Sequence, residues 1–407
     1  MTNKRAAYKR LGDYIEQVNL RNTELRVDYL VGLTINKKFI SSVANIIGTD
    51  LSNYKLIKKN QFACSLMQVS RDGKIPIARF EGEIGIMSPA YPIFKIIDEK
   101  TLMPEYLMMW FERDEFDREA AYYAVGGVRG TLTWEDFCDM KLPLPPISEQ
   151  HKIVAEYQTI ENKIKVNQQI CEKLEAAAQA IYKEWFVEFN FPNKEGKPYK
   201  DSGGKMVWND ELDKEVPEGW EVKELGEISS LITKGTTPKK MSSIKDDKYK
   251  VAYIKGESIG ERNKLLIDKL SFIKETTHAQ QLQRSKIFKN DLLLSIAGTL
   301  GKFCLIKEKY EFNCNQAVAI IRSEISHFLY WTFISGIHKE YFRYNIQQSV
   351  QANFSLTTIR EFKILIPTNI DLIELFIKNF LGLAFVIETQ NQKLTELKSL
   401  LLARMVK

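Results

Sequence analysis

Two loops carry the side chains best suited to contacting the edges of bases. The first reads AVGGVRGTLT (Ala124–Thr133) and the second reads IQQSVQANFS (Ile346–Ser355). Arg129 and Gln351 occupy equivalent places in the two loops, and arginine suits a bidentate contact to guanine whereas glutamine suits one to adenine. The candidate nucleic-acid contacts in these loops are Arg129, Thr131, Gln347, Gln348 and Gln351. The alternative is that both loops are turns whose polar residues face solvent.

A second set of side chains is better suited to phosphates than to bases, because charge alone carries affinity and no sequence information. The segment TKGTTPKK (Thr233–Lys240) combines glycine, proline and three lysines, which favours a loop that contacts a nucleic-acid backbone. The candidate backbone contacts are Lys37, Lys38, Arg71, Lys74, Arg79, Lys234, Thr237, Lys239, Lys240, Lys255 and Lys302.

The distribution of charge supports a polyanionic partner. The net charge is only +6, but residues 232–322 hold 18 Lys and Arg against nine Asp and Glu, and residues 1–80 hold 14 against six. Residues 81–141 are acidic, with six basic residues against 13 acidic ones. Two basic blocks separated by an acidic one indicate particular surfaces for a polyanion. Solvated lysines on ordinary faces are the alternative.

Catalytic motifs are absent from the sequence. It contains no GxxxxGK[ST] phosphate loop, no GxGxxG fingerprint and no Asp/Asn-Pro-Pro-aromatic tetrapeptide of an amino-methyltransferase. Carboxylate pairs such as Asp246-Asp247 have no metal-nuclease context. Five cysteines form no CxxC pair and four histidines have no ligand-like spacing, so we expect reduced cysteines, no metal, no cofactor in this chain and no catalysis.

The element that must position these loops is a long helix predicted after Pro146. From Ser148 onward, apolar residues recur at alternating intervals of three and four, the pattern of a coiled-coil seam. The predicted seam of this helix consists of Ile153, Tyr157, Ile160, Ile164, Asn167, Cys171, Leu174 and Ile181. A helix of about 40 residues would be roughly 60 Å long, too long for an ordinary core helix.

The chain repeats itself with an offset of 230 residues at its KN motifs and of 222 residues further along. KNQFACSLMQVSRDGKIPIA (Lys59–Ala78) parallels KNDLLLSIAGTLGKFCLI (Lys289–Ile306), and MKLPLPP parallels FKILIPT. The second copy ends in its own predicted seam, which consists of Phe376, Phe380, Leu383, Ile387, Gln390, Leu394, Leu397 and Leu401. A period above 200 residues indicates a duplicated domain and helix and excludes a solenoid.

The predicted fold is therefore mixed α/β (α+β), with two globular domains and two long helices. We expect domains at 1–147 and 219–369, long helices at 148–190 and 370–407, and a Gly-, Pro- and Lys-rich linker at 191–218. Short connections favour an antiparallel coiled-coil pair. Asn167 and Gln390 would then meet near its midpoint and fix the register, or both would be partly exposed edge positions.

No membrane span or signal peptide is expected. No apolar run approaches the 18 or so residues that a membrane span needs, and the amino terminus lacks an apolar core. A cytoplasmic location is the expectation.

The sequence resembles the DNA-specificity subunits of type I restriction–modification systems over nearly its whole length. The segments that carry the resemblance are LPLPPISEQHKIV (Leu142–Val154), AQAIYKEWFVEF (Ala178–Phe189), FPNKEGKPYKDSGG (Phe191–Gly204), VPEGWEVKELGEI (Val216–Ile228), GTTP (Gly235–Pro238), KNDLLLSIAGTLGK (Lys289–Lys302), Asn315-Gln316 and ELKSLLLARM (Glu396–Met405).

The resemblance implies two target recognition domains that each read half of a bipartite DNA site, with the helices as a ruler between the half-sites. It implies two modification subunits that bind S-adenosylmethionine and methylate adenine, docked on the helices. It also implies restriction subunits that use ATP and Mg to translocate and cut DNA. The first copy departs from the family by lacking a GxTP segment, so we expect its domain to belong to a diverged recognition class.

Two other classes of protein remain open from the residues alone. One is a self-sufficient DNA methyltransferase or nuclease, which the missing motifs argue against. The other is a structural coiled-coil adaptor that binds no nucleic acid.

Overall fold

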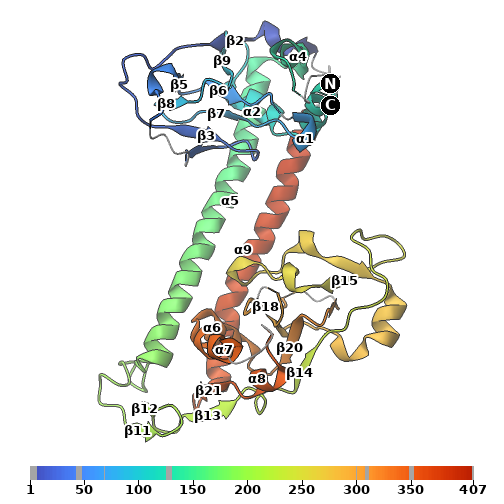
Figure 1. Cartoon of the computed structure of the whole chain (residues 1–407). Helices are drawn as coiled ribbons and strands as arrows, with labels where there is room; N and C mark the ends of the chain where they lie inside the picture. Colours follow the sequence, from blue (N-terminus) through green and yellow to red (C-terminus); the bar gives the residue numbers. More distant parts are fainter. Residues whose placement is uncertain are drawn as a thin grey trace. The chain divides into compact units, whose positions relative to one another are not determined.

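The computed structural model describes residues 7–42, 48–67, 69–124, 131–298, 300–307, 311–347 and 353–405. The chain forms two compact units. The first comprises Met1–Val166 with Gln390–Lys407, and the second comprises Asn167–Thr389. Each unit holds a mixed α/β domain together with segments of two long helices (Figure 1).

A four-stranded antiparallel sheet lies at the centre of the first unit, in the order β2-β9-β6-β7. Its strands are β2 (Ile15–Val18), β9 (Ile93–Ile96), β6 (Phe62–Cys64) and β7 (Ile77–Arg79). Two-stranded pairs are formed by β1 (Tyr8–Arg10) with β10 (Lys141–Pro143), β3 (Val31–Leu33) with β4 (Phe39–Ser41), and β5 (Lys55–Lys58) with β8 (Ile84–Met87).

Helices cover this sheet and bury an aromatic core. They are α1 (Val69–Asp72), α2 (Pro104–Phe111), α3 (Asp114–Ala124) and α4 (Trp134–Asp139). Phe62 and Phe94 stack with ring centroids 5.2 Å apart, and Phe111 meets both rings edge-on. Each large aromatic side chain removed from water contributes about 2–3 kcal/mol, so this cluster is a main source of the unit's stability.

The second unit repeats the same topology. Its four-stranded antiparallel sheet has the order β14-β20-β17-β18, with strands β14 (Leu231–Lys234), β20 (Val318–Arg322), β17 (Leu292–Ser295) and β18 (Phe303–Leu305). The pair β13 (Glu221–Glu224) with β21 (Lys363–Ile366) corresponds to β1 with β10. Helices α6 (Ser326–Ile334), α7 (Ile337–Gln347) and α8 (Leu356–Arg360) correspond to α2, α3 and α4. The predicted internal repeat and mixed fold class are confirmed.

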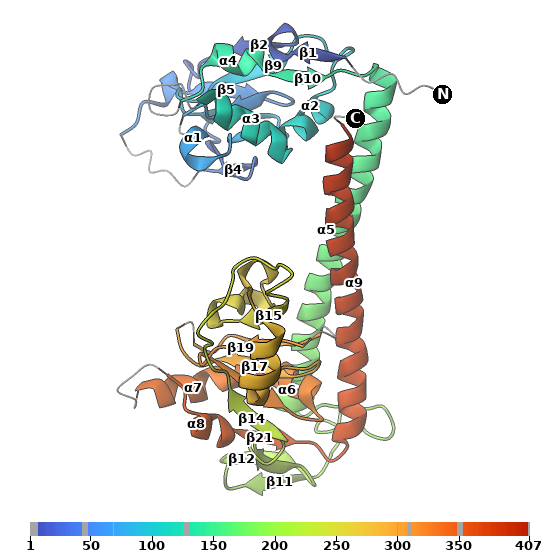
Figure 2. The same ribbon diagram turned by 90° about the vertical axis from the view of Figure 1, so that its right-hand side faces the viewer.

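The second unit also contains a three-stranded sheet in addition to its four-stranded sheet. A three-stranded sheet has the order β16-β15-β19, formed by β16 (Ser271–Ile273), β15 (Val251–Ile254) and β19 (Asn313–Cys314) (Figure 2). In the three-stranded sheet, β15 and β19 are parallel.

Helix α6 packs on strands β17 and β18 of the four-stranded sheet.

The segment predicted to be a linker is folded. Residues 191–218 contain the hairpin β11 (Met206–Asn209) with β12 (Lys214–Pro217). Phe191 stacks between Tyr199 and Trp220, with centroid separations of 4.6 and 5.1 Å. The composition of Gly, Pro and Lys predicted a linker, but Phe191 and Val216 join the segment to the main hydrophobic core of the second unit.

The two long helices are α5 (Ile147–Tyr182), which continues as a π-helical turn to Val187, and α9 (Ile370–Arg404). In the first unit Asn391 donates to the Ile164 carbonyl at 3.4 Å, and the Lys398 ammonium lies 2.6 Å from the Glu161 carboxylate. Rising residue numbers on α5 therefore meet falling numbers on α9. In the second unit the Cys171 thiol is 3.9 Å from the Ala384 carbonyl oxygen, and the Trp185 ring lies 5.3 Å from the Phe376 ring. The helix segments are antiparallel in each unit, as predicted.

Burial along α5 follows the predicted seam, but burial along α9 does not. On α5 the eight seam residues are buried or partly buried, Asn167 at 1% exposure. On α9 Phe380, Ile387, Leu394 and Leu401 are partly buried, whereas Leu383, Gln390 and Leu397 are exposed and Phe376 is 40% exposed, although its ring lies 5.3 Å from that of Trp185.

Next to the exposed positions, Ile377 is buried and Ala384, Asn391 and Lys398 are partly buried. The seam prediction is therefore wrong for Leu383 and Leu397, and the exposure of Gln390 agrees with the alternative of an edge position. Helix α9 carries apolar residues on two faces, and an apolar pattern alone does not tell which face its own chain covers.

Candidate nucleic-acid interface

The loop after β14 in the second unit is held in place by its backbone. Gly235 donates its N–H to the Val318 carbonyl at 3.2 Å, and Thr236 donates to the Cys314 carbonyl at 3.1 Å. A Cβ atom at position 235 would lie 2.0 Å from the Cys314 carbonyl oxygen, so only glycine fits. The loop is thereby pressed onto the turn that joins β19 to β20.

Side chains complete this attachment. The buried Tyr253 hydroxyl donates to the Thr236 carbonyl at 2.9 Å, and the Thr237 hydroxyl donates to the side-chain oxygen of Gln316. The Arg284 guanidinium donates to the Thr236 hydroxyl at 3.0 Å. Thr236 is thus held at three atoms, its N–H, its carbonyl and its hydroxyl, and still lies exposed at the surface. An exposed loop that is this firmly fixed suits a binding surface.

The lysines predicted to accompany this loop divide into two groups. Lys234, Lys239 and Lys240 are exposed and lie next to Gly235–Pro238 in the sequence. Lys255 is partly buried with its ammonium 3.5 Å from the Glu257 carboxylate, and Lys302 is partly buried. The first three lysines are therefore the better candidates for phosphate contacts.

In the first unit, the prediction for Lys37 is wrong. Its side chain is 8% exposed, and its ammonium lies 2.8 Å from the carboxylate of Asp117, which is also buried, and donates to the Phe111 carbonyl. Burial lowers the pKa of Lys37, and the bond to Asp117 opposes that shift. Lys37 is a core ion pair whose removal would leave Asp117 uncompensated, so it is not available to a phosphate.

Arg79 is also engaged within the protein. Its side chain is 17% exposed and its guanidinium lies 2.9 Å from the Glu105 carboxylate and 3.1 Å from that of Glu81. A further bond goes to the Asn60 side-chain oxygen at 2.9 Å. These partners neutralise the charge that made Arg79 a candidate.

The remaining predicted contacts lie in both units. Lys38 and Lys74 are exposed, and Thr131 is partly buried. Arg71 lies on α1, and Gln347 ends α7. Arg129, Gln348 and Gln351 lie outside the described residues, so the comparison of the two base-reading loops stays a prediction.

Two residues at the loop were not among the predicted contacts. Arg284 stands 48 residues from Thr236, and Gln316 stands 79 residues from Thr237. Only the sheet topology, which sets β19 and the turn before β17 beside the end of β14, brings them together. A pairing signal between such distant positions is not visible in one sequence.

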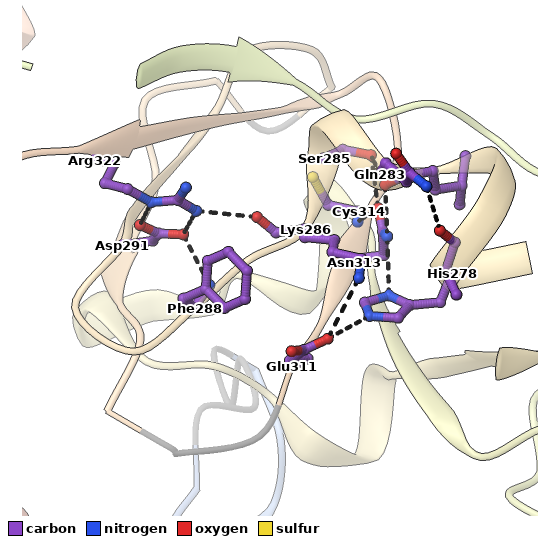
Figure 3. A network of polar contacts seen from close by, with 12 residues as sticks. His278, Gln283, Ser285, Lys286, Phe288, Asp291, Glu311, Asn313, Cys314 and Arg322 are labelled. Carbon is purple, nitrogen blue, oxygen red and sulfur yellow. Dashed lines mark hydrogen bonds and ion pairs between the residues drawn. The ribbon is translucent and has the colours of Figure 1, made fainter. Parts of the chain in front are cut away.

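A separate hollow of about 470 Å³ lies where β17, β20 and α6 meet the start of α9 in the second unit. Two pairs of its polar side chains are bonded to each other. Arg322 binds Asp291 through two bonds of 2.7 Å (Figure 3), which raises the pKa of the guanidinium, and Glu374 lies 2.6 Å from the His327 ring. Glu374 also accepts the backbone N–H of His327 and Phe328 and so caps α6. This arrangement is structural.

Within the described ranges, no group of three or more His, Cys, Asp and Glu residues could hold a metal ion. Among the helices that the structure describes, none combines the length and apolarity that a membrane crossing requires.

Comparison with known proteins matches this architecture to one family. The model of the type I restriction modification DNA specificity domain matches residues 91–176 and 217–399. Over 149 residues the chain is 34% identical to the specificity subunit of the type I restriction enzyme MjaIX of Methanocaldococcus jannaschii, covering 36% of this chain and 32% of that protein. It is 24% identical over 187 residues to the HindI specificity subunit of Haemophilus influenzae, covering 44% and 40%.

Among solved structures, the S subunit of a type I restriction-modification system from M. genitalium has a similar fold. The TM-score is 0.56 at 13% identity, over 100% of this chain and 98% of that one. The sequence matches to the two named relatives span about a third to two fifths of those proteins. Because the family model covers well over half of the residues, in both units, the chain belongs to the type I restriction–modification DNA specificity family.

Proposed function

We propose that this chain is the sequence-reading subunit of a type I restriction–modification complex and recognises a bipartite DNA target. The observation that carries this proposal is the duplication: one topology occurs twice in the chain, and the family model matches segments of both copies. Two copies of one recognition fold suit two half-sites. The proposed recognition domains are residues 1–147 and 219–369.

The chain itself would carry no catalysis and no cofactor. The proposed partners are two modification subunits, which bind S-adenosylmethionine and methylate adenine, and restriction subunits, which use ATP and Mg. The bonds Arg322–Asp291 and His327–Glu374 favour a structural role for the residues they join in the hollow over a catalytic one. Because the target is DNA in the cell, we place the complex in the cytoplasm.

The modification subunit would dock on α9. Within the second unit this helix exposes Leu372, Leu375, Leu383 and Val386 by 68, 53, 52 and 64%. At 3.6 residues per turn these four side chains fall within an arc of about 80°. The buried Ile377 points away from that arc. This exposed face, apolar except for Asn379 at its centre, is suited to a helix of a partner protein.

The test is to express the chain with the modification subunit of its own host and to sequence the methylated genome. The expected result is a methylated bipartite motif with two half-sites and a fixed gap, formed only when this chain is present. Methyl transfer by the purified chain alone would instead favour a self-sufficient enzyme. Failure of the complex to bind DNA at all would favour a structural adaptor.

A further inference from the structure

The 3-10 turn Gln283–Ser285 contains Arg284, and the buried side chain of Asn313 holds this turn in place through hydrogen bonds. Ser285 is 0% exposed and donates its hydroxyl to the Asn313 side-chain oxygen at 2.6 Å. The Asn313 amide donates to the Leu282 carbonyl at 3.1 Å. Asn313, also 0% exposed, therefore holds the turn on both sides of Arg284, and Figure 3 shows its bond with Ser285.

A second layer fixes Asn313 in turn. Its amide nitrogen lies 3.1 Å from Nδ1 of His278, and Nε2 of His278 lies 2.7 Å from the Glu311 carboxylate (Figure 3). Since the amide is the donor, Nδ1 accepts and the proton sits on Nε2, where it bonds to Glu311. Buried polar groups cost several kcal/mol unless every partner is in place, and a complete network specifies one geometry.

The positive charge of the Arg284 guanidinium, which this network holds in place, is not neutralised by a carboxylate among the described residues. Arg284 is exposed and donates one N–H to Thr236. Among the described residues no carboxylate pairs with it. Arg322, in the same unit, differs because Asp291 neutralises it through two bonds of 2.7 Å. The backbone of Arg284 is held by the network and its neighbour is the Thr236 hydroxyl. Its other guanidinium N–H groups can therefore donate hydrogen bonds to an oxyanion.

We propose that Arg284 and the Thr236-Thr237 segment form a phosphate-binding site that holds the DNA backbone against the second unit. This inference rests on the proposed function and names one part of its interface. The exposed Lys234, Lys239 and Lys240 flank the segment, and a site dominated by cations and hydroxyls favours phosphodiester oxygens over base edges. His278, Ser285 and Asn313 are positioning residues that act through the turn.

The experiment uses the complete chain in complex with its modification subunit and a duplex that contains the methylated motif. Binding is measured over a series of KCl concentrations for the wild type, R284Q, R284K and K197Q. Lys197 is an exposed lysine in the hairpin segment, paired with Glu195 at 3.0 Å, and serves as the matched loss of one charge.

We expect R284Q to bind about fivefold more weakly near physiological salt and to reduce the slope of log K against log salt by about 0.9, the value for one phosphate contact. R284K keeps the charge and should retain the slope, and K197Q should match the wild type. The methylated motif should be the same for all four proteins.

Two results would overturn the inference. If the R284Q complex keeps the wild-type salt slope, Arg284 has a structural role and does not contact a phosphate. If R284Q changes the methylated motif at one base, Arg284 reads a base. R284K decides the matter if R284Q fails to assemble, because an altered slope in R284K also contradicts a charge contact. A wild-type complex without any bipartite motif would instead refute the proposed function itself.

Discussion

His338 is held neutral in the core of the second unit. It is 0% exposed, and its ring centroid lies 4.7 Å from that of Phe333 and 5.3 Å from that of Phe303. Burial, reinforced by the charge of Lys339, lowers the pKa of His338 from 6.5 to about 4. In the first unit the equivalent position is taken by Phe116, which is also buried in an aromatic cluster.

The lowered pKa of His338 predicts that the free energy of unfolding falls in acid. The folded pKa lies below the unfolded one, so the unfolded chain binds the proton first. The stability is complete above pH 6.5 and falls as pH drops towards 4, by about 3 kcal/mol in all. His338→Phe, which places the residue of the first unit there, should remove this part of the pH dependence. Denaturant unfolding of both proteins from pH 7 to 4 measures the difference, and identical pH profiles would contradict it.

Gly235 gives a second prediction at the residue scale. Gly235→Ala places a methyl group against the Cys314 carbonyl, so the loop must move and unit stability should fall by about 1–3 kcal/mol. Calorimetric melting of the full chain measures this. The control is Gly382→Ala on α9, where a Cβ atom meets nothing within 4 Å and the gain in helix propensity should add up to about 1 kcal/mol. Equal effects of the two substitutions would refute the close contact.

At the scale of elements, substitutions on the exposed and buried faces of α9 should affect assembly and folding separately. Leu383→Asp replaces a half-exposed side chain and should leave the melting temperature nearly unchanged while it abolishes co-purification with the modification subunit. Ile377→Asp buries a charge at a position with 0% exposure and should unfold the second unit.

Gln392→Asp supplies the matched control, because Gln392 is exposed on the polar side of the same helix. It should co-purify as the wild type does. Full recovery of the modification subunit with Leu383→Asp would show that this face of α9 is not the docking surface.

The elements themselves could be predicted because their signals are local. Apolar residues at intervals of three and four predict a helix wherever it packs, and the repeat offset survives in short motifs such as KN and the Pro-rich strand ends. Which face of α9 the chain covers could not be predicted, because Leu383 and Ile377 are equally apolar. Charge likewise made Lys37 a candidate contact, while its partner Asp117 lies 80 residues further on and becomes its neighbour only through folding.

At the scale of the whole molecule, the two units are separate copies of one topology. If each copy reads one half-site, exchange of residues 219–369 for the equivalent domain of another family member should change one half of the methylated motif and leave the other half unaltered. Methylome sequencing of the hybrid measures this. A change in both halves would contradict independent reading.

The central claim is that this chain alone supplies the DNA sequence specificity of a methylating complex. The most direct measurement is single-molecule sequencing of DNA from cells that express the modification subunit with and without this chain. The prediction is adenine methylation at one bipartite motif, with a fixed gap of roughly one helical turn of DNA, present only when the chain is present. Methylation at the same motif without the chain, or methylation with no bipartite motif in its presence, would contradict the claim.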